Sequence, residues 1–131
     1  EIDAVETFLT EENASALLRD CDIVVDALDN IPGRRILAAA CEKANLPLVY
    51  GAISGWVAQA AVSVPGDKLV ENLYPEDTMV RDKSVLSFTP ALCASIQAAL
   101  CIKYLVGRPV ETGTIYYFDL LNQEFETIPM V

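Results

Sequence analysis

Apolar positions along the first half of the chain alternate between short runs and helical spacings. Short apolar runs predict strands at residues 5–9, 22–27 and 48–52, and the stretches between them carry apolar residues three and four positions apart, as on one helix face. The run at residues 23–25 is continuous, as in a parallel strand covered on both faces. This order predicts an α/β fold whose parallel strands are joined by right-handed crossovers.

Residues typical of helix ends lie where this pattern places helices. Thr10 can cap the first helix, and Glu11 and Glu12 suit the positive end of its dipole. Pro32 occupies the first turn of the second helix, where a missing N–H does no harm, and Pro47 is expected to stop this helix. These residues support the same division into elements.

The pattern of elements changes after the strand at residues 48–52. A further strand is predicted at residues 56–64, and it ends at a Pro-Gly turn signal. Residues 67–88 are polar, charged and poorly periodic, which predicts a long loop. Loops of this length inside a compact domain are commonly functional.

The last third of the chain predicts one long helix and a hairpin. The helix runs from Pro90 to about Val106, and Gly107 is expected to end it. Its apolar residues lie nearly all round the helix, so we expect it to pack on more than one side. Residues 113–121 and 124–130 alternate as in two strands of a closing β-hairpin.

Composition and net charge argue against some classes of binding partner. The chain has 131 residues, which is one ordinary domain, and 53% of them are hydrophobic. Its net charge of −10 argues against nucleic acid and against anionic membranes, because those partners select basic patches. No apolar run reaches the ~20 residues that cross a bilayer. The chain starts with Glu1 rather than Met, and we expect it to be a piece of a longer protein.

The cysteines predict packing rather than chemistry. They form no C-x-x-C pair and the chain has no histidine, so we expect no zinc site of standard spacing and no Cys–His or Ser–His–Asp catalysis. We expect reduced, mostly buried thiols in a cytoplasmic protein. Burial is predicted for Cys41, Cys93 and Cys101, and it is left open for Cys21.

The best candidate site follows the strand at residues 22–27. Ligands gather at the carboxyl ends of parallel strands, and the helix that begins there presents free backbone N–H groups. Asp29 lies beyond the strand and could hold Mg²⁺ while phosphates supply the other oxygens. Asp26 lies at the strand end, where it would organise the turn. From residue type alone, a helix cap by Asp29 or Asn30 outweighs a ligand role.

Two further features of the sequence leave alternatives open. Arg34 and Arg35 lie near the positive end of a helix dipole, so one of them is expected to pair with a carboxylate or an anion. Gly51 and Gly55 flank a strand break, which fits either the close approach of a ligand or chain, or a plain turn. Neither standard Gly-rich phosphate loop occurs in the chain.

Four segments together resemble the ThiF/MoeB/HesA family, relatives of the ubiquitin-activating enzymes. The resemblance covers essentially the whole chain in the right order, and its most specific element is the D-N-x-x-x-R motif. The segments are D-I-V-V-D-A-L-D-N-I-P-G-R-R-I-L, P-L-V-Y-G-A-I-S-G-W-V-A-Q-A-A-V-S-V-P-G-D, T-P-A-L-C-A-S-I-Q-A-A-L-C-I-K-Y-L-V-G and F-D-L…F-E-T-I.

The resemblance implies an activity and a site. Members adenylate the C-terminal diglycine carboxylate of a ubiquitin-like sulfur-carrier protein, or a related carboxylate: the carboxylate attacks the α-phosphorus of Mg-ATP and pyrophosphate leaves. Asp29 matches the catalytic aspartate that holds the Mg²⁺ of Mg-ATP, and Asn30 and Arg34 match its neighbours in the cofactor site. The resemblance further implies a homodimer and a partial Rossmann-like parallel sheet, together with the long helix and hairpin already predicted. It also identifies the loop at residues 67–88 as the family's crossover loop.

Departures from the family pattern limit this expectation. The Gly-rich nucleotide loop, the ribose-binding acid and the phosphate-binding Arg and Lys are expected upstream of Glu1. Residues 69–75 stand where a zinc-binding Cys pair would be, and the loop at residues 67–88 holds no cysteine for a thioester or persulfide step. We therefore expect residues 1–131 to be the C-terminal portion of one adenylating domain, inactive alone. The alternative is a non-catalytic module for dimerisation or carrier-protein docking.

Overall fold

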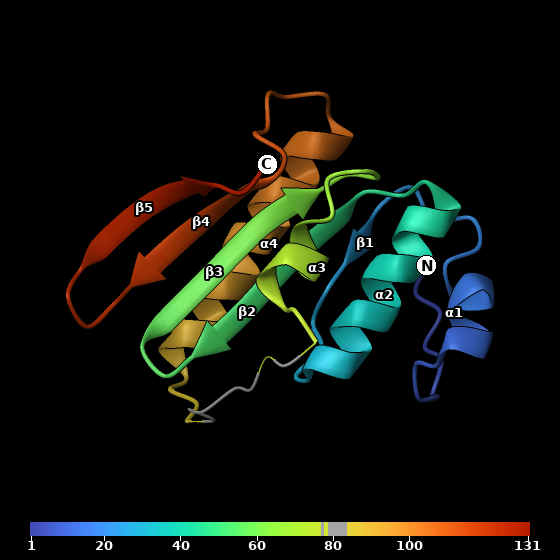
Figure 1. Cartoon of the computed structure of the whole chain (residues 1–131), viewed down its shortest axis with the longest axis horizontal. Coiled ribbons are helices and arrows are strands. Elements are labelled where there is room, and N and C mark those ends of the chain that lie inside the picture. The colour runs from blue at the N-terminus through green and yellow to red at the C-terminus, as the bar shows by residue number, and fades with distance from the viewer. Residues whose placement is uncertain (77, 79–83) are drawn as a thin grey trace.

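A five-stranded sheet in the order β1-β2-β3-β4-β5 forms the centre of the fold (Figure 1). The structure is a computed structural model that describes residues 1–76, 78 and 84–131. The α/β class predicted from the sequence is confirmed. In chain order the elements are α1 (Glu11–Leu17), β1 (Val24–Val25), α2 (Ile31–Ala44), β2 (Leu48–Ser54), β3 (Val57–Ser63), α3 (Leu69–Leu73), α4 (Phe88–Leu105), β4 (Thr114–Asp119) and β5 (Glu124–Pro129).

Strand pairing agrees with the sequence for the first crossover. β1 lies parallel to β2, with Val24 opposite Leu48, and α2 connects them. The pairs β2–β3, β3–β4 and β4–β5 are antiparallel, so the parallel part of the sheet within the described residues is its β1 edge.

Two expectations at this edge of the sheet are wrong. Residues 5–9 form no strand: no described strand pairs with them, and the Phe8 side chain is 89% exposed. The strand expected at residues 22–27 is also covered incompletely on its second face, where Ile23 packs against the core around Val49 but Val25 does not. Val24 is buried, whereas Val25 is 45% exposed because no described element packs over it.

Helices cover both faces of the sheet. One core joins α1, α2 and α3 to the face that carries Leu48, Tyr50 and Ala61. The other core joins α4 to the opposite face through Val49 and Val62, as expected for residues that alternate along a strand. Figure 1 shows α4 behind the sheet and α3 in front of it.

The ends of α1 and α2 follow local rules. Thr10 caps α1 as predicted, since its Oγ1 accepts from Asn13 N while Asn13 Oδ1 accepts from Thr10 N. α2 contains Pro32 in its first turn, also as predicted. It ends at Ala44 rather than at Pro47, because Asn45 adopts a left-handed conformation (φ 56°) that terminates the helix.

The predicted loop at residues 67–88 contains a helix. α3 lies inside it and buries Leu69 and Val70 completely or nearly so. A helix forms here because Leu69, Val70 and Leu73 repeat at a helical spacing that the surrounding charges obscure. Residues 77 and 79–83 of the predicted crossover loop lie outside the described residues.

The long helix α4 is confirmed, but its expected packing is wrong. It packs on β2 and β3 through one face, made of Thr89, Cys93, Gln97 and Leu100. On the other face Ile102 is 61% exposed, and no described element covers it. α4 is also long and apolar enough to cross a bilayer by length and composition alone, a property that helices packed on sheets share. Gly107, with φ 68°, follows its last turn.

The closing hairpin is confirmed as β4 and β5. Asp119 shapes its turn, because Oδ1 accepts from the backbone N–H groups of Leu121 and Asn122. These hydrogen bonds lower the pKa of Asp119. β5 is exposed along its whole length and forms the second edge of the sheet.

Candidate functional site

The predicted site is the turn that joins β1 to the N-terminus of α2. Asn30 is the cap of α2, since its Oδ1 accepts from Gly33 N at 2.7 Å. Asp29 is exposed, and its Oδ1 accepts from Asn30 Nδ2 at 3.1 Å. The cap and the exposed carboxylate are therefore different residues. Asp29 remains available for a ligand at the positive end of a 14-residue helix.

Arg34 lies one turn into α2 and points inward. Its Nη1 lies 2.7 Å from Asp26 Oδ2, and both side chains are buried. The guanidinium also donates to Gly51 O from Nη1 and to Leu28 O from Nη2. One side chain thus ties together the end of β1, the turn and β2. The prediction that an arginine here pairs with a carboxylate is confirmed for Arg34, while Arg35 is half-buried.

Asp26 organises the turn, as predicted from its place at the strand end. Its carboxylate is 1% exposed and accepts from Leu28 N at 2.8 Å in addition to Arg34. Burial raises the pKa of Asp26, whereas the positive charge of Arg34 and the Leu28 N–H act in the opposite direction. A buried carboxylate with these partners holds the backbone that carries Asp29.

Gln97 supports the same turn from the other face of the sheet, a role that the sequence analysis missed. Its Nε2 donates to Asp26 O at 2.7 Å and to Val49 O at 3.1 Å. The side chain is buried where β1 and β2 diverge beyond their short paired segment. The sequence did contain one signal for this role: Gln97 is a single side-chain amide on the buried face of an apolar helix, and such a group needs a polar partner.

Gly51 is required by Gln97 rather than by a ligand. A Cβ built on Gly51 would lie 2.3 Å from Gln97 Cδ. Close approach, one of the two alternatives for this glycine, is therefore correct, and the approaching group belongs to the same chain. The other alternative, a plain turn, is correct for Gly55, which lies between β2 and β3 with φ 54°.

Replacing Gly51 by alanine should expose this dependence. We expect Gly51→Ala to lower the free energy of unfolding by about 1–3 kcal/mol, because the added Cβ pushes the Gln97 amide off Asp26 O and Val49 O. In a Gln97→Ala background the same change should cost little. Urea unfolding of the four proteins measures both costs. Equal costs in the two backgrounds would show that Gln97 is not the reason for the glycine.

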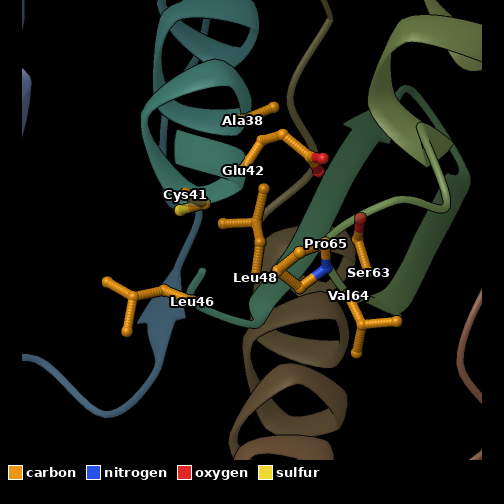
Figure 2. Close-up of a pocket in the computed structure, with 8 residues that line it drawn as sticks. All are labelled: Ala38, Cys41, Glu42, Leu46, Leu48, Ser63, Val64 and Pro65. Carbon is orange, nitrogen blue, oxygen red and sulfur yellow. The ribbon is translucent and has the colours of Figure 1, made fainter. Parts of the chain in front are cut away.

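The pocket in Figure 2 lies away from this turn. It is formed by the C-terminal half of α2, the start of β2 and the end of β3, whereas Asp29 precedes the N-terminus of α2. It therefore lies at the amino end of the parallel pair, opposite the end where such sheets bind ligands. Its lining residues are Ala38, Cys41, Glu42, Leu46, Leu48, Ser63, Val64 and Pro65.

Comparison with known proteins identifies the family. The model of the ThiF family matches residues 1–131. The chain belongs to the ThiF family. It is 32% identical over 136 residues to the SAMP-activating enzyme E1 of Haloferax volcanii, covering 98% of this chain and 50% of that protein. It is 31% identical over 141 residues to the sulfur carrier protein adenylyltransferase of Thermus thermophilus, covering 97% and 52%.

Solved structures of similar fold include Escherichia coli MccB. With MccA-N7isoASN, MccB gives a TM-score of 0.73 at 15% identity, covering 94% of this chain and 41% of that one. With ATP it gives 0.69 at 17% identity, covering 93% and 41%. At these identities the likeness concerns the fold. This ThiF-family chain spans about half the length of the curated relatives just named.

The cysteines of this ThiF-family chain are placed much as predicted. Cys41 and Cys93 are buried, Cys101 is half-buried and Cys21 is exposed. Burial raises the pKa of Cys41 to about 11 and also raises that of Cys93, so neither thiol ionises at neutral pH. Within residues 1–76, 78 and 84–131, no three His, Cys, Asp or Glu side chains gather as metal ligands. Residues 69–75, which stand where a Cys pair would be, instead include α3, which buries Leu69 and Val70.

Proposed function

We propose that this ThiF-family chain is part of an ATP-dependent adenylyltransferase that activates the C-terminal carboxylate of a ubiquitin-like sulfur-carrier protein with a diglycine end. One observation carries the proposal: an exposed aspartate, Asp29, sits at the carboxyl end of a parallel strand beside the N-terminus of α2. The names of two relatives, a SAMP-activating E1 and a sulfur carrier protein adenylyltransferase, support the reaction class.

The residues of the turn fit Mg-ATP. Mg²⁺ is commonly bound by one or two protein carboxylates, with water and substrate phosphates completing its shell, so a single exposed Asp29 suffices. The free N–H groups at the start of α2 favour the negative charge of phosphate. Mg-ATP would supply the electrophilic α-phosphorus, which the carrier carboxylate attacks as pyrophosphate leaves. This chain's part is to bind and orient that nucleotide.

Asn30 and Arg34 support Asp29 by different means. Asn30 fixes the first turn of α2 as its cap. The Arg34 guanidinium donates hydrogen bonds to Leu28 O and to the Asp26 carboxylate. We assign both residues to orienting the Asp29 carboxylate. Their direct contact with the nucleotide stays a prediction, as do a cytoplasmic location and the absence of zinc, nucleic-acid and membrane partners.

We expect residues 1–131 alone to show no ATP–pyrophosphate exchange. The chain spans about half of its relatives, and the described Asp29 turn supplies only one carboxylate and one helix end to a transferred group that bears several charges. The measurement is exchange of labelled pyrophosphate into ATP, with the full-length protein assayed beside the 131 residues. Exchange by the shorter chain at a comparable rate would show that the site is complete within it.

The proposal itself is tested with the full-length protein. We expect exchange that depends on a ubiquitin-like carrier protein ending in two glycines, and loss of that exchange when the carrier lacks its last glycine. The shortened carrier is the matched control, because its folded surface is unchanged. Failure of all such carriers to stimulate exchange would contradict the substrate assignment.

The outward face of α4 supports a homodimer. Ile102, Leu105 and Val106 are exposed there, and α4 contains no acidic residue in a chain of net charge −10. A second copy could therefore pack on α4 without strong charge repulsion. The same observation favours the alternative function, a non-catalytic dimerisation module. The exchange assay separates the two, since such a module would dimerise without turnover.

A further inference from the structure

Three polar side chains form a second buried cluster beside the Arg34 ion pair. Tyr50 lies on β2 and is fully buried, Tyr74 directly follows α3 and is also buried, and Gln59 lies on β3. Gln59 Nε2 donates to the Tyr50 hydroxyl at 2.8 Å, and the hydroxyl oxygens of Tyr50 and Tyr74 are 2.5 Å apart. The Tyr50 oxygen thus accepts from Gln59 and also shares a hydrogen bond with the Tyr74 hydroxyl.

The ring of Tyr50 connects this cluster to the candidate site. Arg34 Cζ lies 5.5 Å from the centre of the Tyr50 ring, within the range of a cation–π contact. The guanidinium is thus held by Asp26, by two backbone carbonyls and by an aromatic ring. Burial raises the pKa of Tyr50, so its hydroxyl stays protonated as a donor. Buried phenols normally keep such partners, and losing them costs free energy.

We propose that Tyr50 and Tyr74 are positioning residues that act through Arg34 on the Asp29 turn. The hydroxyl pair fixes the orientation of the Tyr50 ring, and the ring holds the Arg34 guanidinium that lies over it. The guanidinium in turn sets Leu28 O and the Asp26 carboxylate, which together define the backbone leading into Asp29. This role rests on the proposed function, since its consequence is tighter binding of Mg-ATP.

The cluster also joins two distant parts of the chain. Tyr74 belongs to the stretch at residues 67–88, and Arg34 belongs to the D-N-x-x-x-R motif. α3 and α2 are in contact on the same face of the sheet. The position of α3 is therefore coupled, through one hydroxyl pair and one ring, to the turn that carries Asp29.

The test removes one oxygen atom from the cluster in the full-length protein. In Tyr74→Phe the ring stays while the hydrogen bond to the Tyr50 hydroxyl is lost. We expect the Mg-ATP concentration that half-saturates ATP–pyrophosphate exchange to rise roughly tenfold, as when outer-shell partners of a metal ligand are removed. Tyr50→Phe should give a similar rise, and the double variant should add little because both residues act through the same bond.

Tyr104→Phe is the matched control, because Tyr104 is exposed near the C-terminus of α4 and loses the same atom. A half-saturating concentration in Tyr74→Phe within twofold of that in Tyr104→Phe would overturn the positioning role, whatever happens to the melting temperature.

A second measurement does not need activity. Hydrogen exchange at the Leu28 amide, which donates to Asp26, should be at least fivefold faster in Tyr74→Phe than in Tyr104→Phe. If the wild-type protein shows no ATP–pyrophosphate exchange, the proposed function fails, and this amide still decides the positioning role. An unchanged Leu28 exchange rate would contradict the coupling.

Discussion

Replacing Arg34 by leucine is expected to lower the free energy of unfolding by about 3–5 kcal/mol. The substitution leaves the Asp26 carboxylate, 1% exposed, without its cationic partner, and it leaves Leu28 O without the donor that Arg34 provides. Leucine fills much of the same volume, so the cost should come from unpaired polar groups rather than from a cavity. Urea unfolding of the full-length protein, followed by circular dichroism, measures it.

Two matched variants separate the ion pair from general effects on α2. Arg35→Leu changes the next residue of the same helix turn and should cost about 0.5 kcal/mol or less. The double variant Asp26→Leu/Arg34→Leu should lose clearly less free energy of unfolding than the two single variants together. Each single change leaves the other partner buried without its ion pair. Similar costs for Arg34→Leu and Arg35→Leu would contradict the assigned role.

Asp29→Asn should have the opposite profile, with a large effect on activity and almost none on stability. In the full-length protein we expect ATP–pyrophosphate exchange to fall about a hundredfold or more, the effect typical of losing one charge-stabilising group in an active site. The free energy of unfolding should change by about 0.5 kcal/mol or less, because Asp29 is exposed and Asn30 supplies the helix cap.

Asp22→Asn is the control for this substitution. Asp22 is exposed before β1, so the same change of charge occurs near the site but at the opposite end of the strand. Exchange in Asp22→Asn should stay close to that of the wild type. If Asp29→Asn retains the same ATP–pyrophosphate exchange as Asp22→Asn, Asp29 has only a structural role in the turn and is not a ligand.

Local signals in the sequence predict most elements and part of the site. Thr10, Gly107 and the apolar runs after residue 20 predict helices and strands correctly, because capping and periodicity act over a few residues. The roles of Asp26 and Arg34 also follow locally, since a carboxylate at a strand end and a cation near a helix start each need a partner. The family resemblance then adds the expected ligand of Asp29.

Long-range contacts explain what the sequence could not predict. Residues 5–9 have the composition of a strand but no neighbouring strand in the described residues, and the apolar outer face of α4 has no described partner. Gln97 is 71 residues from the Asp26 carbonyl that it binds, and Tyr50 is 24 residues from Tyr74. Nothing in residue type or spacing pairs side chains at such separations.

The most direct test of the site is to locate the metal. In the full-length protein with ATP, paramagnetic Mn²⁺ in place of Mg²⁺ should broaden the amide signals of Leu28, Asp29 and Asn30 most strongly among residues 1–131. Asp29→Asn should abolish that broadening, and Asp22→Asn should leave it unchanged. Broadening centred elsewhere in these residues, or unaffected by Asp29→Asn, would contradict the assignment of Asp29 as the ligand of Mg-ATP.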